Sequence, residues 1–220
     1  MIARADIITQ GDPTLIADQW AAAMETQAAL PGFVEARLHR VYRLINKTDY
    51  RFLSVVQWRG AEDHAASLPV AGAYGFLTSP PTDPMANTYT LFNSAKGPET
   101  TRPPDHITVI NPYRIAASEE HGYAEMWDQS ARHMASKDGF IDAQFYRACR
   151  NGEPYHFVSR AAWRSEDAFM KQFEGADFRT IVAPYEGIFC ISLSRLAGAV
   201  PSAAAAASPN ATDPTERALS

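Results

Sequence analysis

The 220-residue sequence has only two cysteines, no long apolar run and no excess of positive charge. Cys149 and Cys190 are far apart and form no C-x-x-C spacing, so we expect reduced thiols and no cysteine metal site. No apolar stretch approaches the roughly 20 residues that a membrane span requires. The net charge of -5 argues against partners such as nucleic acid or an anionic membrane. The first residues lack a basic patch followed by an apolar stretch, so we expect a cytoplasmic protein.

Motifs for phosphate, dinucleotide or metal binding are also missing. The sequence contains no G-x-G-x-x-G pattern and no P-loop. Its six histidines do not pair at the i,i+4 spacing that places two ligands on one helix face. We therefore predict no metal site.

The sequence does contain an internal repeat. Trp20 and Trp127 are 107 residues apart, and the same spacing relates Arg40 to Arg147. After a hairpin that differs in length by two residues, a spacing of 105 relates Trp58 to Trp163. Matching tryptophans in register at two places indicate that one structural unit occurs twice.

Each repeat predicts the same order of elements, strand, helix, two strands joined by a hairpin, short helix and strand. This β-α-β-β-α-β order is the ferredoxin-like arrangement. The fold class is therefore α+β, with two tandem ferredoxin-like units packed sheet to sheet as a barrel within one chain. The predicted strands are 2–9, 33–44, 50–59 and 88–93 in the first repeat, and 107–113, 140–150, 155–164 and 187–196 in the second.

The same patterns divide the chain into segments. Residues 1–94 and 106–196 are the two predicted domains, and the proline-rich segment 95–105 is a linker. Residues 197–220 consist largely of Ala, Ser, Pro and Thr. We expect this tail to be disordered, because it has too few large apolar side chains to offset the entropy of ordering.

Two motifs occur in both repeats. Pro31-Gly32-Phe33 is followed by Tyr-x-Phe-x-Ser-x-x-x-Trp-Arg at 50–59, and Asp138-Gly139-Phe140 by the same pattern at 155–164. These motifs resemble the antibiotic biosynthesis monooxygenase (ABM) family of dimeric α+β barrels. The resemblance implies oxidation of electron-rich aromatic polyketides by molecular oxygen without a metal. Tandem relatives that open or contract the rings of angucycline-type polyketides use reduced flavin, and other members degrade haem.

The resemblance also implies the position of the site. Trp58 and Trp163 are at the family's pocket tryptophan position, although each can equally fill a core. Ser54 and Ser159 lie four residues earlier on the same face of the strand, where the family characteristically has Asn. A serine hydroxyl can donate to a developing oxyanion, so we predict catalytic roles for these four residues.

His64 is the predicted base, because it follows Trp58 at the start of a short helix and imidazole has a suitable pKa. The alternative is a structural histidine. Haem-degrading members have an axial histidine on the helix that follows the pocket tryptophan. His64 is the only histidine of this sequence at such a position. We further predict substrate contacts, or for the arginines salt bridges, from Arg40, Arg147, Tyr146, Trp127 and Trp20.

The sequence thus predicts an oxygenase for a polycyclic aromatic polyketide in antibiotic or secondary-metabolite biosynthesis. The predicted cofactor is none, or reduced flavin (FMNH2 or FADH2) as a co-substrate supplied by a flavin reductase. The alternatives are a non-catalytic ligand-binding barrel and a haem-degrading monooxygenase. The chain is predicted to be a monomer that forms a pseudo-dimer, or a homodimer.

Overall fold

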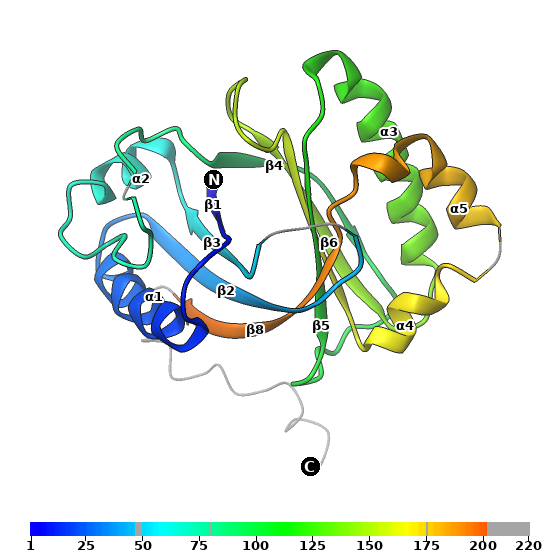
Figure 1. Cartoon of the computed structure of the whole chain (residues 1–220), viewed down its shortest axis with the longest axis horizontal. Coiled ribbons are helices and arrows are strands. Elements are labelled where there is room, and N and C mark those ends of the chain that lie inside the picture. Colours follow the sequence, from blue (N-terminus) through cyan, green and yellow to red (C-terminus); the bar gives the residue numbers. More distant parts are fainter. Residues whose placement is uncertain (47–49, 80, 175, 202–220) are drawn as a thin grey trace, which may run out of the picture.

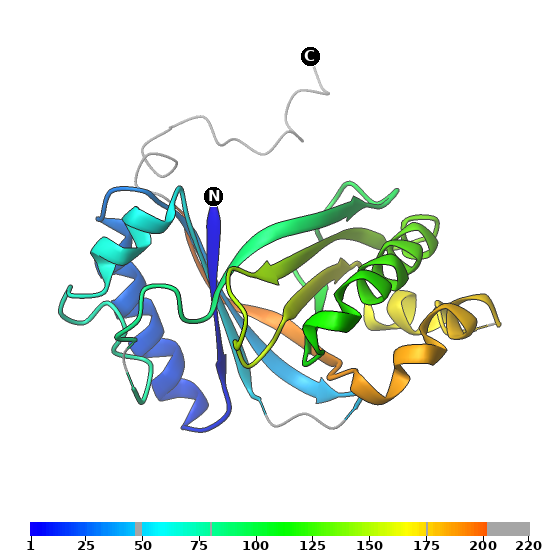
Figure 2. The same ribbon diagram turned by 90° about the horizontal axis from the view of Figure 1, so that it is seen from above.

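The computed structural model describes residues 1–46, 50–79, 81–174 and 176–201, which form one closed antiparallel barrel with helices outside it. Helices α1 and α2 cover one side of the barrel, and α3, α4 and α5 cover the opposite side (Figures 1 and 2). The predicted α+β class is confirmed.

The elements follow one another in the predicted order. The first half contains β1 (Ile2–Ile8), α1 (Pro13–Ala28), β2 (Phe33–Leu44), β3 (Phe52–Trp58), α2 (Ala61–Ser67) and β4 (Thr88–Lys96). The second half contains β5 (Ile107–Tyr113), the 3-10 helix η1 (Ala117–Glu119), α3 (Glu120–Ala135), β6 (Phe140–Ala148), β7 (Phe157–Trp163), α4 (Glu166–Lys171), α5 (Asp177–Val182), the 3-10 helix η2 (Ala183–Ile188) and β8 (Ser192–Pro201).

Local sequence signals explain where these elements begin. The Asp12 side chain caps α1 by accepting hydrogen bonds from the backbone of Thr14 and Leu15, at 2.9 and 3.1 Å. Gly32 and Gly139 precede β2 and β6 with φ of +81° and +80°. A Cβ at Gly139 would also come within 2.6 Å of Ala168, so this turn needs glycine for both conformation and space.

The strand order around the barrel is β1-β3-β2-β8-β5-β7-β6-β4. Strand β4 pairs with β1 of its own half and with β6 of the other half. Strand β8 likewise pairs with β5 and with β2. The last strand of each half therefore closes the barrel against the other half.

Strand alternation divides the buried residues into three groups. Trp58 and Phe52 face α1, while Trp163 and Phe157 face α3, in two clusters between the barrel and its helices. The third cluster lies inside the barrel and includes Leu53, Val55, Ile110, Tyr146 and Val158.

The structure corrects the predicted boundaries near the end of the chain. The last strand begins at Ser192, not at 187, and continues to Pro201, so the prediction of disorder is wrong for residues 197–201. Gly198 lies against α1, where a Cβ would come within 2.7 Å of the Trp20 ring. Small residues are needed there for packing. Residues 202–220 lie outside the described part of the chain. Strand β4 also extends to Lys96, past the predicted domain end at 94.

Candidate functional site

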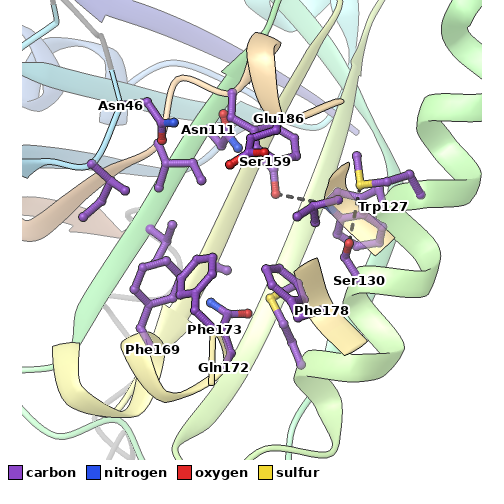
Figure 3. Close-up of a pocket in the computed structure, with 18 of the residues that line it drawn as sticks. Asn46, Asn111, Trp127, Ser130, Ser159, Phe169, Gln172, Phe173, Phe178 and Glu186 are labelled. Atoms are coloured by element: carbon purple, nitrogen blue, oxygen red, sulfur yellow. Dashed lines mark hydrogen bonds between the residues drawn. The ribbon is translucent and has the colours of Figure 1, made fainter. Parts of the chain in front are cut away.

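A cavity of about 510 Å³ lies between the outer face of the barrel and the helices of the second half (Figure 3). This volume falls in the range of small-molecule sites, and such sites are typically apolar with a few polar groups. Strands β5 and β7 form its floor, while α3, α4, α5 and η2 form its walls. Its apolar lining includes Val109, Tyr113, Met126, Trp127, Met134, Ala161, Trp163, Phe169, Phe173, Phe178, Val182, Phe189 and Ile191.

A side-chain hydrogen bond links a helix to a strand in the wall of this cavity. The indole Nε1 of Trp127 on α3 donates to Ser159 Oγ on β7 at 3.0 Å. The Trp127 ring also stacks on Phe145, with centroids 4.6 Å apart and planes 6° apart. Ser159 therefore orients the aromatic wall of the cavity, a contact for which its family position gave no indication.

Asn111 is directly opposite Ser159 on the neighbouring strand β5. Its Oδ1 accepts a hydrogen bond from the backbone of Cys190 at 2.9 Å, which fixes the orientation of the amide group. Tyr113, two residues further on the same strand face, interacts through its hydroxyl with both Asn111 and Ser159. These three residues form a polar spot in the apolar floor, and Figure 3 labels two of them, Asn111 and Ser159.

Burial raises the pKa of the Tyr113 hydroxyl far above its usual range, and its hydrogen bonds with Ser159 and Asn111 only partly oppose this shift. Tyr113 is therefore protonated at neutral pH and can act as a hydrogen-bond donor. The family motif does not include Asn111, because this residue lies on a different strand. The only sequence signal is an amide in a largely apolar strand.

Three further polar atoms of the lining have no hydrogen-bond partner among the described residues. They are Asn46 Oδ1 and, on side chains that are 0% and 2% exposed, the Trp163 Nε1 donor and the Gln172 Oε1 acceptor. Buried polar groups without a partner are uncommon in folded proteins. A ligand hydroxyl could satisfy both the Trp163 donor and the Gln172 acceptor, because it can accept one hydrogen bond and donate another. Exposed Arg179 and Glu186 lie at the margin of the cavity.

The first half repeats only part of this arrangement. Trp20 Nε1 donates to Ser54 Oγ at 2.9 Å, as Trp127 does to Ser159. The position of Asn111 is occupied by Asp6, which is opposite Ser54 and forms a buried ion pair with Arg4 at 2.6 Å. None of Trp20, Ser54 and Trp58 lines the cavity of the second half.

His64 is also outside this cavity. It is fully buried beside Trp58, with ring centroids 6.0 Å apart. Burial and then the charge of Arg4 lower the pKa of His64 to about 4, although the backbone of Pro84 opposes the shift. The imidazole is therefore neutral at physiological pH. Among the described residues that line the cavity, none is a histidine.

The predicted substrate-binding residues are dispersed, except for Trp127. Arg40 is exposed on β2. Arg147 donates to Glu120 at 3.0 Å and lies over the Phe92 ring at 5.1 Å. Tyr146 lies inside the barrel, where its hydroxyl donates to Gln144 at 3.0 Å. The structure thus brings together Trp127, Ser159 and Trp163 from the predicted set.

The described part of the chain contains no group of three or more His, Cys, Asp or Glu side chains placed to hold a metal ion. No helix in this part is long and apolar enough to cross a membrane. Cys149 carries a free thiol.

Comparisons with known proteins add a family and a fold. Residues 106–184 match the sequence pattern of the family described as antibiotic biosynthesis monooxygenase, ABM. A search of curated sequences found no match. An anthrone oxidase-like protein of known structure superposes with a TM-score of 0.66 and 14% identity, over 92% of this chain and 93% of its own.

Two other solved structures share the fold at similar coverage. A candidate monooxygenase from Fusobacterium nucleatum has a TM-score of 0.61 and 8% identity, over 91% of this chain and 93% of its own. A major regulator of staphylococcal pathogenesis has a TM-score of 0.51 and 7% identity, over 88% of this chain and 98% of its own. At these identities the likeness concerns the fold alone.

Proposed function

The second half of the chain is a domain of the ABM family, and from this premise we propose that the protein is an oxygenase for an electron-rich polycyclic aromatic substrate. The observation that carries the proposal is the aromatic cavity of about 510 Å³ with a polar spot in its floor. Its volume suits a fused-ring molecule, and its polar groups suit the oxygens of such a molecule.

The two halves are, in this proposal, a fused pair of ferredoxin-like units at 1–94 and 106–196. The repeated Trp–Ser hydrogen bonds, the shared order of elements and the equivalent pairing of β4 and β8 support this origin. Catalysis is assigned to the second half alone. In the first half the ion pair of Arg4 with Asp6 occupies the position that corresponds to the polar spot.

The chemistry can be driven by the substrate itself. An anthrone loses a proton from its central ring, and the resulting anion transfers one electron to oxygen. The two radicals combine, and loss of water gives the quinone, so one O2 is consumed and one water is formed for each quinone. This route is proposed because a relative in fold is named as anthrone oxidase-like.

Each step needs a group that the cavity contains. Asn111 and Tyr113 would donate hydrogen bonds to the oxyanion of the deprotonated substrate. Trp163 Nε1 and Gln172 Oε1 would hold an oxygen substituent at the other end of the molecule. Glu186, an exposed carboxylate in the lining of the cavity, is the proposed base.

The cofactor remains part of the proposal in two forms. The oxygenase works without a cofactor, or it takes electrons from reduced flavin delivered by a reductase. Haem fits less well, because the described cavity lining offers no histidine as an axial ligand. Addition of haem and a search for a shifted Soret band tests the haem alternative directly.

Oxygen consumption tests the main proposal. The full-length protein is mixed with an anthrone, and O2 uptake and quinone formation are followed with and without reduced FMN. Uptake in equal amount to quinone without flavin supports the cofactor-free form, and uptake only with reduced FMN supports the flavin form. If neither condition accelerates quinone formation above the protein-free rate for anthrones or hydroxylated angucyclinones, the proposal is wrong.

A second candidate is a non-catalytic ligand-binding barrel. It is favoured by the lack of histidine among the described lining residues and by the similar fold of a bacterial regulator. Binding of the aromatic compound can be measured by the quenching of Trp127 and Trp163 fluorescence. Saturable binding without any turnover would support the non-catalytic function.

A further inference from the structure

A second cavity, of about 340 Å³, lies at one mouth of the barrel. It is separate from the aromatic cavity, because its walls come from the inner face of β2 and β7, the end of β8 and the segment before β5. The lining contains an unusual set of basic side chains, which are Arg37, His39, Arg102, His106 and Arg160.

Two of these side chains are almost completely buried, and each has at least one nitrogen without a hydrogen-bond partner among the described residues. His39 is 1% exposed, and neither of its ring nitrogens has a partner among the described residues. Arg160 is 7% exposed, and its Nη1 likewise has none. Its Nε and Nη2 both donate to Gln144 Oε1, at 3.2 and 2.5 Å, which holds the guanidinium in place. Buried donors without a partner carry a free-energy cost that a ligand can remove.

The two nearby carboxylates pair with arginines of this same cavity. Glu35 accepts hydrogen bonds from Arg37 at 3.0 Å and from Gln57 at 3.1 Å. Asp142 pairs with Arg102, and its other oxygen is 3.8 Å from Arg160 Nη2. These two carboxylates do not neutralise three arginines, so the cavity has an excess of positive charge.

The basic set is not required by the fold. At the repeat spacing, Arg37 corresponds to Gln144, His39 to Tyr146 and Arg160 to Val55. The matching positions in the other half therefore form the same barrel with uncharged side chains. The excess charge is a particular feature of this mouth.

We propose that this mouth of the barrel binds the oxyanion head, phosphate or carboxylate, of a small molecule, with Arg160 and His39 as its inner donors. Guanidinium groups suit such heads because they present several N–H donors in one plane. Arg37 and Arg102 add positive charge from the sides. The aliphatic side chains of Leu196 and Val200 also line the cavity and would contact the apolar part of the ligand.

The electrostatics of His39 supply a measurable signal. Burial and then the charges of Arg160, Arg37, His106 and Arg102 hold the pKa of His39 well below its usual range. A bound anion would oppose these charges. Its binding should therefore raise the pKa of His39 and take up a proton.

The test is a titration followed by NMR of the histidine rings in the full-length protein. Inorganic phosphate and benzoate are added separately at constant ionic strength, and the His39 signal is assigned with the variant His39→Gln. We expect saturable shifts with a Kd of about 1 mM or tighter. The His39 titration should move to higher pH. A response to phosphate alone identifies a phosphate head, and a response to benzoate alone identifies a carboxylate head.

Variants make the result specific. Arg160→Gln should weaken binding by about tenfold or more, as expected from the loss of a charge-assisted hydrogen bond. Arg102→Gln tests the same site at a side chain that is 33% exposed and whose replacement is less disruptive. Arg59→Gln, at a surface arginine outside this cavity, is the charge-matched control and should bind normally. The proposal is overturned if neither anion shifts His39 saturably, or if Arg160→Gln and Arg102→Gln bind as tightly as the control.

Discussion

At the level of single residues, the proposed chemistry depends most on Asn111. The substitution Asn111→Asp keeps the oxygen that accepts from Cys190, but it removes the amide donor and places a charge beside the developing anion. It also introduces the residue type that the first half has at Asp6. We expect kcat/KM for oxygen-dependent quinone formation to fall by about 100-fold or more.

The matched control for this variant is Ser130→Ala. Ser130 lines the same cavity, but its hydroxyl donates only to the Met126 sulfur at 3.4 Å. Its removal should change kcat/KM by about twofold or less, since no donor to substrate is lost. Equal losses in both variants would show that Asn111 acts through packing and not as a donor.

His64 gives a prediction about stability. Its pKa of about 4 in the folded state lies below the unfolded value of 6.5, so the unfolded chain binds the proton more readily. The contribution to stability is complete above pH 6.5 and is lost as the pH falls towards 4. The free energy of unfolding of the wild type should therefore fall by about 2 kcal/mol between pH 7 and pH 5 because of His64. In His64→Phe this part of the pH dependence should be missing.

Urea unfolding at the two pH values checks this difference. Phenylalanine is a conservative choice, because Phe169 packs on Trp163 in the second half at 5.8 Å, as His64 packs on Trp58. Oxygenase activity should be unaffected, since His64 is outside the aromatic cavity. A large loss of activity in a stable His64→Phe protein would instead support His64 as the base.

These residues show what the sequence could and could not predict about the site. The repeated motif led to Ser159 and Trp163, because residues four apart on a strand share a face. It could not lead to Asn111, Gln172 or Glu186, which come from other elements. Their proximity depends on strand pairing and on the position of α4 and η2, and neither is encoded in local spacing.

At the level of elements, a Trp–Ser hydrogen bond joins a helix to a strand in both halves. Comparison of the two bonds can therefore separate an effect on stability from an effect on activity. Ser54→Ala and Ser159→Ala each leave a buried indole N–H without its acceptor. Each should lower the free energy of unfolding by about 1–3 kcal/mol. Only Ser159→Ala should also lower activity, because only Ser159 borders the cavity.

Thermal unfolding and oxygen uptake, measured on both variants, check this expectation. Activity is compared well below the lower melting temperature, so that stability does not limit it. If Ser54→Ala reduced kcat as strongly as Ser159→Ala, the assignment of catalysis to the second half would be wrong.

The end of the chain shows how composition can mislead at this level. Residues 197–201 were predicted to be disordered because they are small and lack apolar bulk. In the structure these residues continue β8 along β2, with Pro201 opposite Glu35. Small side chains allow β8 to pass close to Trp20. A strand selected for such close packing therefore has the same amino-acid composition as a disordered segment.

At the level of the whole molecule, the two halves share one order of elements, but the two cavities differ in position and lining. The order of elements follows from hydrophobic period and turn residues, and it was predictable from the sequence. The pairing of β4 with β6 and of β8 with β2 across the two halves was only implied by the expected barrel, because it joins strands far apart in sequence. The aromatic cavity and the basic mouth arise where the two repeats differ.

The strand pairing between the two halves leads to a prediction about the linker between β4 and β5. A protease site inserted after Thr100 and then cut should leave the two fragments associated, because β4 pairs with β6 and β8 pairs with β2. Gel filtration should show one species of the original size. Unfolding should become dependent on protein concentration, as in a dimer, whereas the uncut protein with the same insertion should show no such dependence. Separation of the fragments without denaturant would mean that each half folds alone, and that the barrel is two independent domains in contact.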